Sequence, residues 1–186
     1  MAFGMSQRES GYARKERDLY ETPAWVTEAL LPHLPRPPSH VLEPASGAGK
    51  MAEVLRAAGL SVTASDLADG HDFLAMTETL ADAIITNPPY TEATAFIEHA
   101  LDLTKGAGMV AMLLRTDFDH ARTRQHLFAQ CGAFAKKVVL TRRIIWFDGP
   151  KAAPSFNHAW YLWDWQHSGA PTLAYDRQML KQGRTR

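Results

Sequence analysis

The sequence has a single cysteine, Cys131, among its 186 residues, so no disulfide can form within the chain. Paired cysteine and histidine spacings of the kind that bind zinc are also absent, and we expect no metal. No apolar run approaches the roughly 20 residues that span a bilayer, and the first ten residues contain no apolar signal core. These absences predict a reduced, cytoplasmic setting with no membrane partner.

The length and composition fit one compact domain, because 46% of the residues are apolar and 22% are charged. A chain of 186 residues has no room for a catalytic domain together with a full recognition domain. The predicted divisions are a polar N-terminal arm over residues 1–17, a single domain over 18–168 and a C-terminal tail over 169–186.

The formal net charge is zero, but the charges are unevenly distributed along the chain. Residues 18–104 hold 3 Lys/Arg against 13 Asp/Glu, whereas residues 105–186 hold 13 against 5. Such blocks either average out when the chain folds or give the molecule one basic face. A basic face would suit a nucleic-acid partner.

Short apolar segments alternate with amphipathic ones from residue 40 onward, which is typical of a parallel sheet covered by helices. Strands are predicted at 41–44, 61–65, 83–86 and 109–114, followed by a terminal pair at 137–141 and 158–165. Helices are predicted at 50–59, 92–104 and 119–131, the last capped by Asp119. A further helix is predicted to start at Thr22 and Pro23 and to end near Pro32.

A glycine-containing turn, residues 43–49, joins the first predicted strand to its helix. Glycines at such a place permit a sharp turn and a close backbone approach to a ligand beside the helix start. The turn lacks the full dinucleotide-binding fingerprint, so an ordinary structural turn is the alternative. Glu43, at its beginning, is suited either to face a cationic amino acid group or to cap the turn.

Two acidic residues follow at the next strand positions. Asp66 ends the second predicted strand, where a carboxylate either accepts hydrogen bonds from the two hydroxyls of a ribose or caps the next turn. Asp72 precedes Phe73 at the third strand position, and this pair can bind the amine edge of an adenine and pack against its ring. The alternative for Asp72 is a solvated acid on a loop.

The most specific motif is Asn87, Pro88, Pro89 and Tyr90, directly after a buried strand. Two prolines fix the backbone and remove two N–H donors, so the local carbonyls and the Asn87 amide oxygen remain as acceptors. Tyr90 adds a flat ring beside them. The motif is suited to hold a planar NH2 group between two acceptors while the ring that bears this group stacks on Tyr90.

These motifs, in this order and each after a predicted strand, resemble those of the class I S-adenosylmethionine-dependent methyltransferases of amino groups, with small DNA adenine methyltransferases the most similar. The resemblance covers roughly residues 19–165. It implies a Rossmann-like α/β fold with a seven-stranded, mostly parallel sheet, an antiparallel last strand and helices on both faces. It also implies S-adenosylmethionine as cofactor, held by Tyr20, Thr22, Glu43, Ala45, Gly47, Asp66, Asp72, Phe73 and Asn87.

The same resemblance implies methyl transfer to an exocyclic amine of a nucleic-acid base, with adenine N6 in DNA ranked first and RNA second. The catalytic residues would be Asn87, Pro88, Pro89 and Tyr90. Without a recognition domain, sequence specificity is expected to be short or absent. The motif is shared with enzymes that methylate a protein glutamine amide, and this alternative stays open. A small-molecule amine methyltransferase would need a lid, for which only the N-terminal arm is available.

Basic and aromatic residues before the last predicted strand suit contacts to phosphates and bases. A base taken out of a duplex needs a second aromatic ring opposite Tyr90, and Trp146, Phe147 and Phe156 are the candidates. Arg122 and Arg124 follow the strand next to the Asn87 motif and are hypothesised to share its rim. The predicted substrate-binding residues are Tyr90, Arg115, Arg142, Arg143, Phe147 and Phe156.

Overall fold

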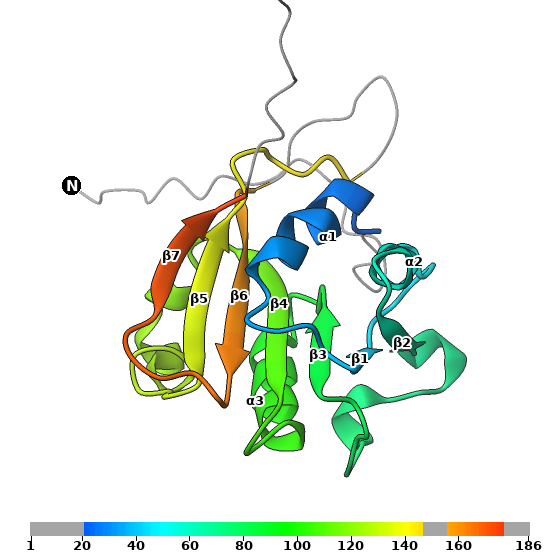
Figure 1. Ribbon diagram of the computed structural model, residues 1–186, viewed down its shortest axis with the longest axis horizontal. Coiled ribbons are helices and arrows are strands. Elements are labelled where there is room, and N and C mark those ends of the chain that lie inside the picture. Colours follow the sequence, from blue (N-terminus) through cyan, green and yellow to red (C-terminus); the bar gives the residue numbers. More distant parts are fainter. Residues whose placement is uncertain (1–20, 147–155, 177–186) are drawn as a thin grey trace, which may run out of the picture.

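Seven short strands pair into one sheet in the computed structural model, which describes residues 21–146 and 156–176 (Figure 1). Their order across the sheet is β2-β1-β3-β4-β6-β5-β7. The strands are β1 His40–Glu43, β2 Ser61–Ala64, β3 Ala83–Thr86, β4 Met109–Arg115, β5 Phe134–Val139, β6 His158–Asp164 and β7 Thr172–Tyr175.

Only β6 runs against its neighbours, since it pairs antiparallel with both β4 and β5, and the other pairs are parallel. This confirms the predicted mostly parallel, seven-stranded sheet, with the reversed strand sixth along the chain. The strand that follows it, β7, lies within the segment 169–186 and pairs with β5. The six co-directional strands therefore all end at one edge of the sheet.

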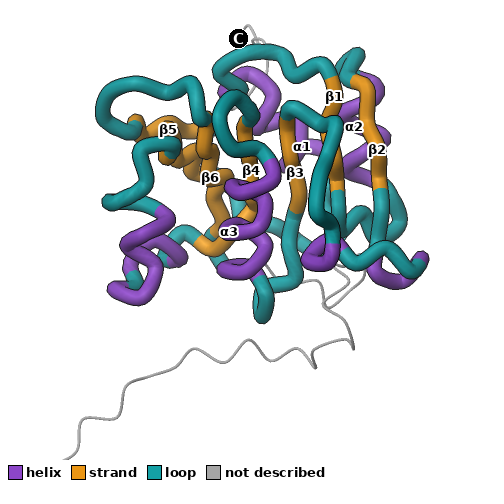
Figure 2. Tube along the Cα trace, turned by 90° about the horizontal axis from the view of Figure 1, so that it is seen from below, coloured by secondary structure: helices purple, strands orange, loops and turns teal. Residues whose placement is uncertain are grey.

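Helices cover both faces, as predicted (Figures 1 and 2). The alternation of side chains along β4 explains why both faces are buried. Val110, Met112 and Leu114 pack in the core beneath α3, Ala93–Leu103. Residues of the opposite parity, such as Leu113, pack with α1, Ala24–Leu30, and α2, Lys50–Ala57. A strand buried on both sides reads as a continuous apolar run.

Two tryptophans of β6 show how buried polar atoms are satisfied. The Trp160 indole donates a hydrogen bond of 2.8 Å to the carbonyl of Val26 in α1. The Trp163 indole donates one of 2.6 Å to the carbonyl of Leu127 on the opposite face. Because an unpaired N–H would be costly in the core, each bond fixes the segment that it reaches.

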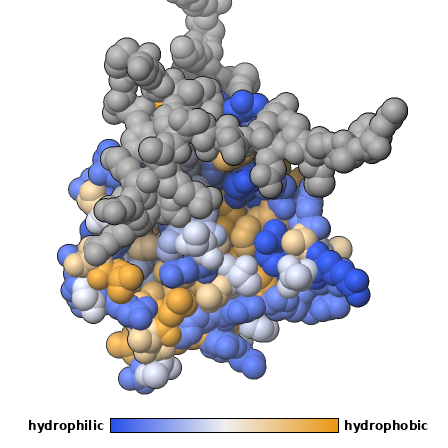
Figure 3. Space-filling view, turned by 180° about the vertical axis from the view of Figure 1, so that it is seen from behind, coloured by the Kyte–Doolittle hydropathy of each residue, from blue (hydrophilic) through white to orange (hydrophobic). Residues whose placement is uncertain are grey.

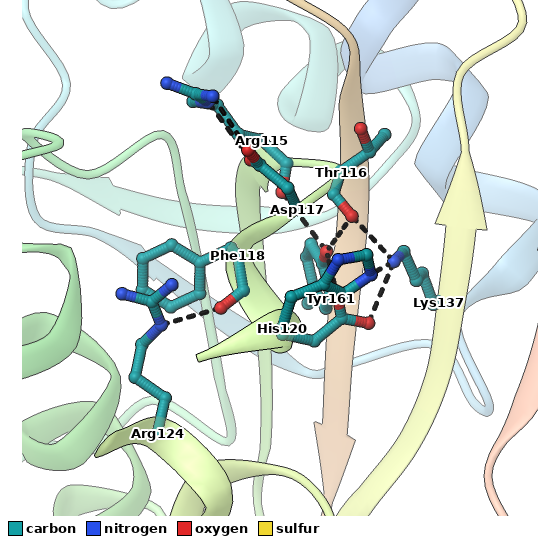
Figure 4. A network of polar contacts seen from close by, with 9 residues as sticks. Arg115, Thr116, Asp117, Phe118, His120, Arg124, Lys137 and Tyr161 are labelled. Atoms are coloured by element: carbon teal, nitrogen blue, oxygen red, sulfur yellow. Dashed lines mark hydrogen bonds and ion pairs between the residues drawn. The ribbon is translucent and has the colours of Figure 1, made fainter. Parts of the chain in front are cut away.

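The predicted helix at 119–131 is wrong. The chain instead forms two 3-10 helices, η4 at Phe118–His120 and η5 at Arg122–Leu127. The Asp119 carboxylate caps neither of them, because it is bonded to Lys137 Nζ at 2.8 and 3.0 Å and to the Tyr161 hydroxyl at 3.2 Å (Figure 4). The Asp119 carboxylate, which was predicted to cap the helix, is thus engaged in a tertiary ion pair with Lys137 instead.

The segment between β2 and β3 contains no strand; it holds two short 3-10 helices, η2 at Leu67–Asp69 and η3 at Phe73–Ala75. Three leucines of this segment, Leu67, Leu74 and Leu80, are exposed. On the face that α3 covers, hydrophobic residues reach the surface at several places among hydrophilic ones (Figure 3). None of the described helices is long and apolar enough to cross a membrane.

Candidate active site

A cleft of about 1000 Å³ opens where the carboxyl ends of β1, β2 and β3 meet. The strand order changes direction at β1, which has β2 on one side and β3 on the other. Loops that leave neighbouring strands toward opposite faces separate there and create a crevice. The loops after these three strands supply most of the residues that line the cleft.

The glycine turn after β1 is held by Asp66, from the end of β2. The Gly47 N–H donates to Asp66 Oδ2 at 2.9 Å, and the Ala68 N–H donates to Asp66 Oδ1 at 2.8 Å. Gly49, with φ +83°, adopts the left-handed conformation immediately before α2. The capping role considered for Asp66 is therefore real. An ionised carboxylate has about four lone-pair sites, so two remain for further donors.

Glu43 lies at the end of β1 on the floor of the cleft, with 2% of its surface exposed. Its Oε2 atom is buried without a hydrogen-bond partner among the described residues. Burial raises the pKa of this carboxyl from 4.5 to about 8, although the Ala52 backbone N–H and Arg56 partly oppose the shift. Glu43 therefore keeps its proton at neutral pH unless a cationic group lies beside it.

This raised pKa predicts that the unliganded protein loses stability as the pH rises. Below pH 4.5 the Glu43 carboxyl is protonated in both the folded and the unfolded chain. Between pH 4.5 and about 8, which is the pKa of Glu43 in the folded chain, only the folded chain keeps this proton. The free energy of unfolding should thus fall by up to ~1.4 kcal/mol per pH unit across that window. Glu43→Gln should remove this slope in denaturant titrations at pH 5 to 9. Glu53→Gln, on the exposed side of α2, is the control, and parallel curves for wild type and Glu43→Gln would contradict the prediction.

Asp72 and Phe73 also line the cleft, at the start of η3. Asp72 Oδ1 accepts a hydrogen bond of 3.0 Å from the Leu74 N–H, and the side chain is exposed to the cleft. Phe73 is buried against Phe96 of α3, with ring centroids 4.9 Å apart. The pair offers a fixed apolar wall beside an acceptor. It lies at a 3-10 helix and not directly after a strand, because the segment between β2 and β3 contains none.

The fully buried β3 brings the Asn87 motif to the rim of the cleft. Asn87 and Pro89 line the cleft, and Pro88 is buried behind them. Tyr90 does not line the cleft; it turns toward β6, where its hydroxyl lies 2.8 Å from His158 Nε2. The motif therefore presents polar groups to the cleft while its tyrosine is tied to the next part of the sheet.

The structure brings most of the predicted cofactor residues together although they come from different loops. Tyr20 lies outside the described residues. The other eight all line the cleft: Thr22, Glu43, Ala45, Gly47, Asp66, Asp72, Phe73 and Asn87. Sequence reasoning missed Lys50, which lines the cleft and forms an ion pair with Glu21. It also missed His158, because a histidine that begins a strand carries no motif.

Three of the predicted basic residues lie at the carboxyl edge of the sheet. Arg115 ends β4, forms an ion pair with Asp117 at 2.8 Å and has its guanidinium 4.2 Å from the Phe156 ring centroid. Arg142 lies 4.0 Å from the ring centroid of Trp25, and Arg143 donates to Asn157 at 3.0 Å. Within the described part of the chain, neither Arg142 nor Arg143 has a carboxylate partner.

The remaining predictions for this rim have different outcomes. Arg124 lies in η5, with its guanidinium 4.1 Å from the Phe118 ring centroid, and it donates a hydrogen bond to the Phe118 carbonyl (Figure 4). Arg122 begins the same 3-10 helix, and the hypothesis that these two arginines share the rim stays a prediction. Trp146 lines the cleft, whereas Phe147 lies outside the described residues.

No protein-family model matches the sequence, and comparison with curated protein sequences finds no match. Solved structures do share the fold. A candidate class I S-adenosylmethionine-dependent methyltransferase of Listeria monocytogenes matches with a TM-score of 0.61 at 14% identity, over 88% of this chain and 68% of its own. A predicted O-methyltransferase of Agrobacterium tumefaciens matches with 0.50 at 14% identity, over 88% and 90%. The modification subunit of a candidate type I restriction enzyme of Vibrio vulnificus matches with 0.52 at 16%, over 84% and 46%. At such identities the similarity establishes the Rossmann-like methyltransferase fold and not the substrate.

Proposed function

We propose that this protein is an S-adenosylmethionine-dependent methyltransferase that acts on an exocyclic amine of a nucleic-acid base, with adenine N6 in DNA as the first candidate. One observation carries the proposal: Glu43, Asp66 and Asn87, at or just after the carboxyl ends of three different strands, converge on one cleft at the switch point of the sheet. A fold alone hosts many activities, so the chemistry of the cleft is the stronger support.

The donor and acceptor groups of the cleft fit S-adenosylmethionine. The Oε2 atom of Glu43, buried without a described partner, suits a cationic amino group. The two remaining lone-pair sites of Asp66 suit the ribose hydroxyls, and Asp72 with Phe73 suits the amine edge and ring of an adenine. When bound, this cofactor supplies an electrophilic methyl carbon on a sulfonium. That the three subsites match its three polar parts supports the assignment.

Asn87 and Pro88 would orient the amine that receives the methyl group. The Asn87 side-chain oxygen and the Pro88 carbonyl are acceptors, and the two prolines contribute no N–H of their own. The nitrogen of such an NH2 group is weakly nucleophilic, because its lone pair is conjugated with the ring. Hydrogen bonds to the two acceptors would direct that lone pair into the cleft. The new nitrogen–methyl bond would form as the methyl–sulfur bond breaks, which leaves a neutral thioether and a positively charged nitrogen. No side-chain base is needed in this scheme, since that nitrogen then loses its proton to water.

The basic edge favours nucleic acid over a protein substrate. Arg142 and Arg143 adjoin the cleft-lining Trp146 in sequence and lack carboxylate partners in the described chain, so their charge is available to phosphates. A protein-glutamine methyltransferase would use the same Asn87 acceptors, but it gives no reason for this concentration of arginines. RNA remains the second nucleic-acid candidate.

The proposed function can be tested by incubating the protein with a methyl-labelled cofactor and separate DNA, RNA and protein pools. We expect label in nucleic acid, and digestion to nucleosides should yield the N6-methylated adenine nucleoside. Label in the protein pool alone would contradict the nucleic-acid assignment and favour the glutamine alternative. Absence of label in every pool would contradict methyl transfer itself.

Joint replacement of Arg142 and Arg143 by alanine should weaken nucleic-acid binding and its dependence on salt. Each phosphate contact contributes ~0.9 to the slope of log affinity against log salt for duplex DNA, so the slope should flatten by up to ~2. Fluorescence anisotropy at several salt concentrations measures it. Lys105→Ala with Arg56→Ala removes the same number of exposed charges, just after α3 and in the last turn of α2, and should leave the slope unchanged. An unaltered slope in the first variant would remove Arg142 and Arg143 from the interface.

A further inference from the structure

His158 begins β6 and is buried, with 1% of its surface exposed. Its Nε2 atom lies 2.8 Å from the Tyr90 hydroxyl, and the two ring planes are inclined by 29°, with centroids 5.9 Å apart. The Trp146 ring meets the imidazole edge-on, with centroids 5.4 Å apart and an interplanar angle of 84°. One imidazole thus contacts an aromatic ring of the Asn87 motif and an aromatic ring that lines the cleft.

The imidazole is suited to a structural bond and not to proton transfer. Burial lowers the pKa of His158 from 6.5 to about 4; the Phe156 backbone and Asp117 oppose the shift, and Arg115 adds to it. A neutral imidazole has one N–H donor and one acceptor nitrogen. A phenolic hydroxyl can serve either, so the Tyr90 bond persists throughout the neutral pH range.

Strand pairing on both sides fixes the backbone of β6 at His158. This residue pairs with Arg115 of β4 in the central part of the sheet, and the neighbouring Ala159 pairs with both β4 and β5. Tyr90 and Trp146, in contrast, lie on loops, where a ring without a tether has other rotamers available. A hydrogen bond from a central strand removes that freedom for Tyr90.

We propose that His158 is a positioning residue: it fixes Tyr90 beside the cleft and, through edge contact, the cleft-lining Trp146, so that a planar substrate ring that enters the cleft is received beside Asn87. This inference rests on the proposed function, because the ring to be received is the one that bears the methylated amine. His158 itself touches neither the substrate nor the reacting atoms. Its effect is on the geometry of the rings, where a displacement of ~1 Å can cost as much as 100-fold in rate.

Steady-state kinetics of four variants test the inference. His158→Phe keeps a ring but loses the bond, and should lower kcat ~10-fold or more while the cofactor Kd stays within about twofold. Tyr90→Phe should lower kcat by a similar factor, and the double variant should be no worse than either single one, because both remove the same bond. His158→Gln, whose amide reaches the position of Nε2, should restore kcat to within about threefold of wild type.

Controls separate a positioning effect from general damage. Tyr175→Phe and His126→Gln make the same kinds of change at exposed positions on β7 and η5, and should leave kcat unaltered. Calorimetric titration of the cofactor and thermal unfolding show whether His158→Phe has kept its fold, and if it has not, Tyr90→Phe provides the test. Loss of kcat with intact cofactor binding and rescue by glutamine supports the inference.

The two possible failures are distinguishable. Wild-type protein that methylates no nucleic acid overturns the proposed function, and this inference with it. Wild-type protein that is active while His158→Phe and Tyr90→Phe turn over normally overturns the inference alone. Additive losses in the double variant also overturn it, since they would mean that the two side chains act independently.

Discussion

Asn87→Ala is expected to lower kcat for methyl transfer on the order of 100- to 1000-fold while leaving the cofactor affinity within a few fold. The Asn87 oxygen would hold the amine as positive charge develops on its nitrogen, and removal of one preorganised hydrogen-bonding group from such a position typically has an effect of this size. Because the contact strengthens in the transition state, kcat and kcat/KM should fall together. Single-turnover assays with labelled cofactor, combined with calorimetry, measure both quantities.

The matched control for this change is Gln166→Ala, which removes an exposed side-chain amide at the other edge of the sheet. Its turnover should equal that of wild type. If Asn87→Ala also turned over at a near-normal rate, the two-acceptor mechanism would be wrong, and the cleft would have to orient its substrate by other groups. A parallel loss of cofactor affinity would instead place Asn87 mainly in the cofactor site.

Asp66→Ala should weaken cofactor binding about 10- to 100-fold, because hydrogen bonds to a charged acceptor are worth ~1.5 to 3 kcal/mol each. The structure adds a second expected effect. The Gly47 and Ala68 N–H groups both donate to this carboxylate, so the glycine turn should loosen and the variant should unfold at a lower temperature. Isothermal titration calorimetry and thermal unfolding measure the two effects separately.

Asp102→Ala, an exposed acid on α3, is the control, and should change neither quantity. A variant that is less stable but binds the cofactor with unchanged affinity would leave Asp66 as a cap only. That outcome would favour the structural role considered from the sequence over ribose binding. Loss of affinity beyond what Asp102→Ala shows, in protein that is folded at the assay temperature, would support both roles at once.

The sequence by itself determined the central sheet and most of the cleft. The apolar runs that became β3 and β4 are buried on both faces, and the glycine turn begins where β1 ends, because strand length, apolar period and turn residues are local properties. Asp66 and Asn87 could be placed at one edge from the order of the motifs alone. Parallel strands with crossover helices must end on the same side, so residues directly after them come together.

Only the tertiary structure decided how individual side chains are used. Asp119 has the residue type and position of a helix cap, yet Lys137 and Tyr161, distant in sequence, bind its carboxylate and the helix does not form. Tyr90 is predicted to stack on the substrate ring, and no sequence pattern indicates that its hydroxyl lies 2.8 Å from Nε2 of His158, 68 residues away. These outcomes depend on competition between a local partner and a remote one. A sequence pattern indicates the local partner of a side chain. It does not indicate which remote residue comes within bonding distance, because the packing of the sheet sets that distance.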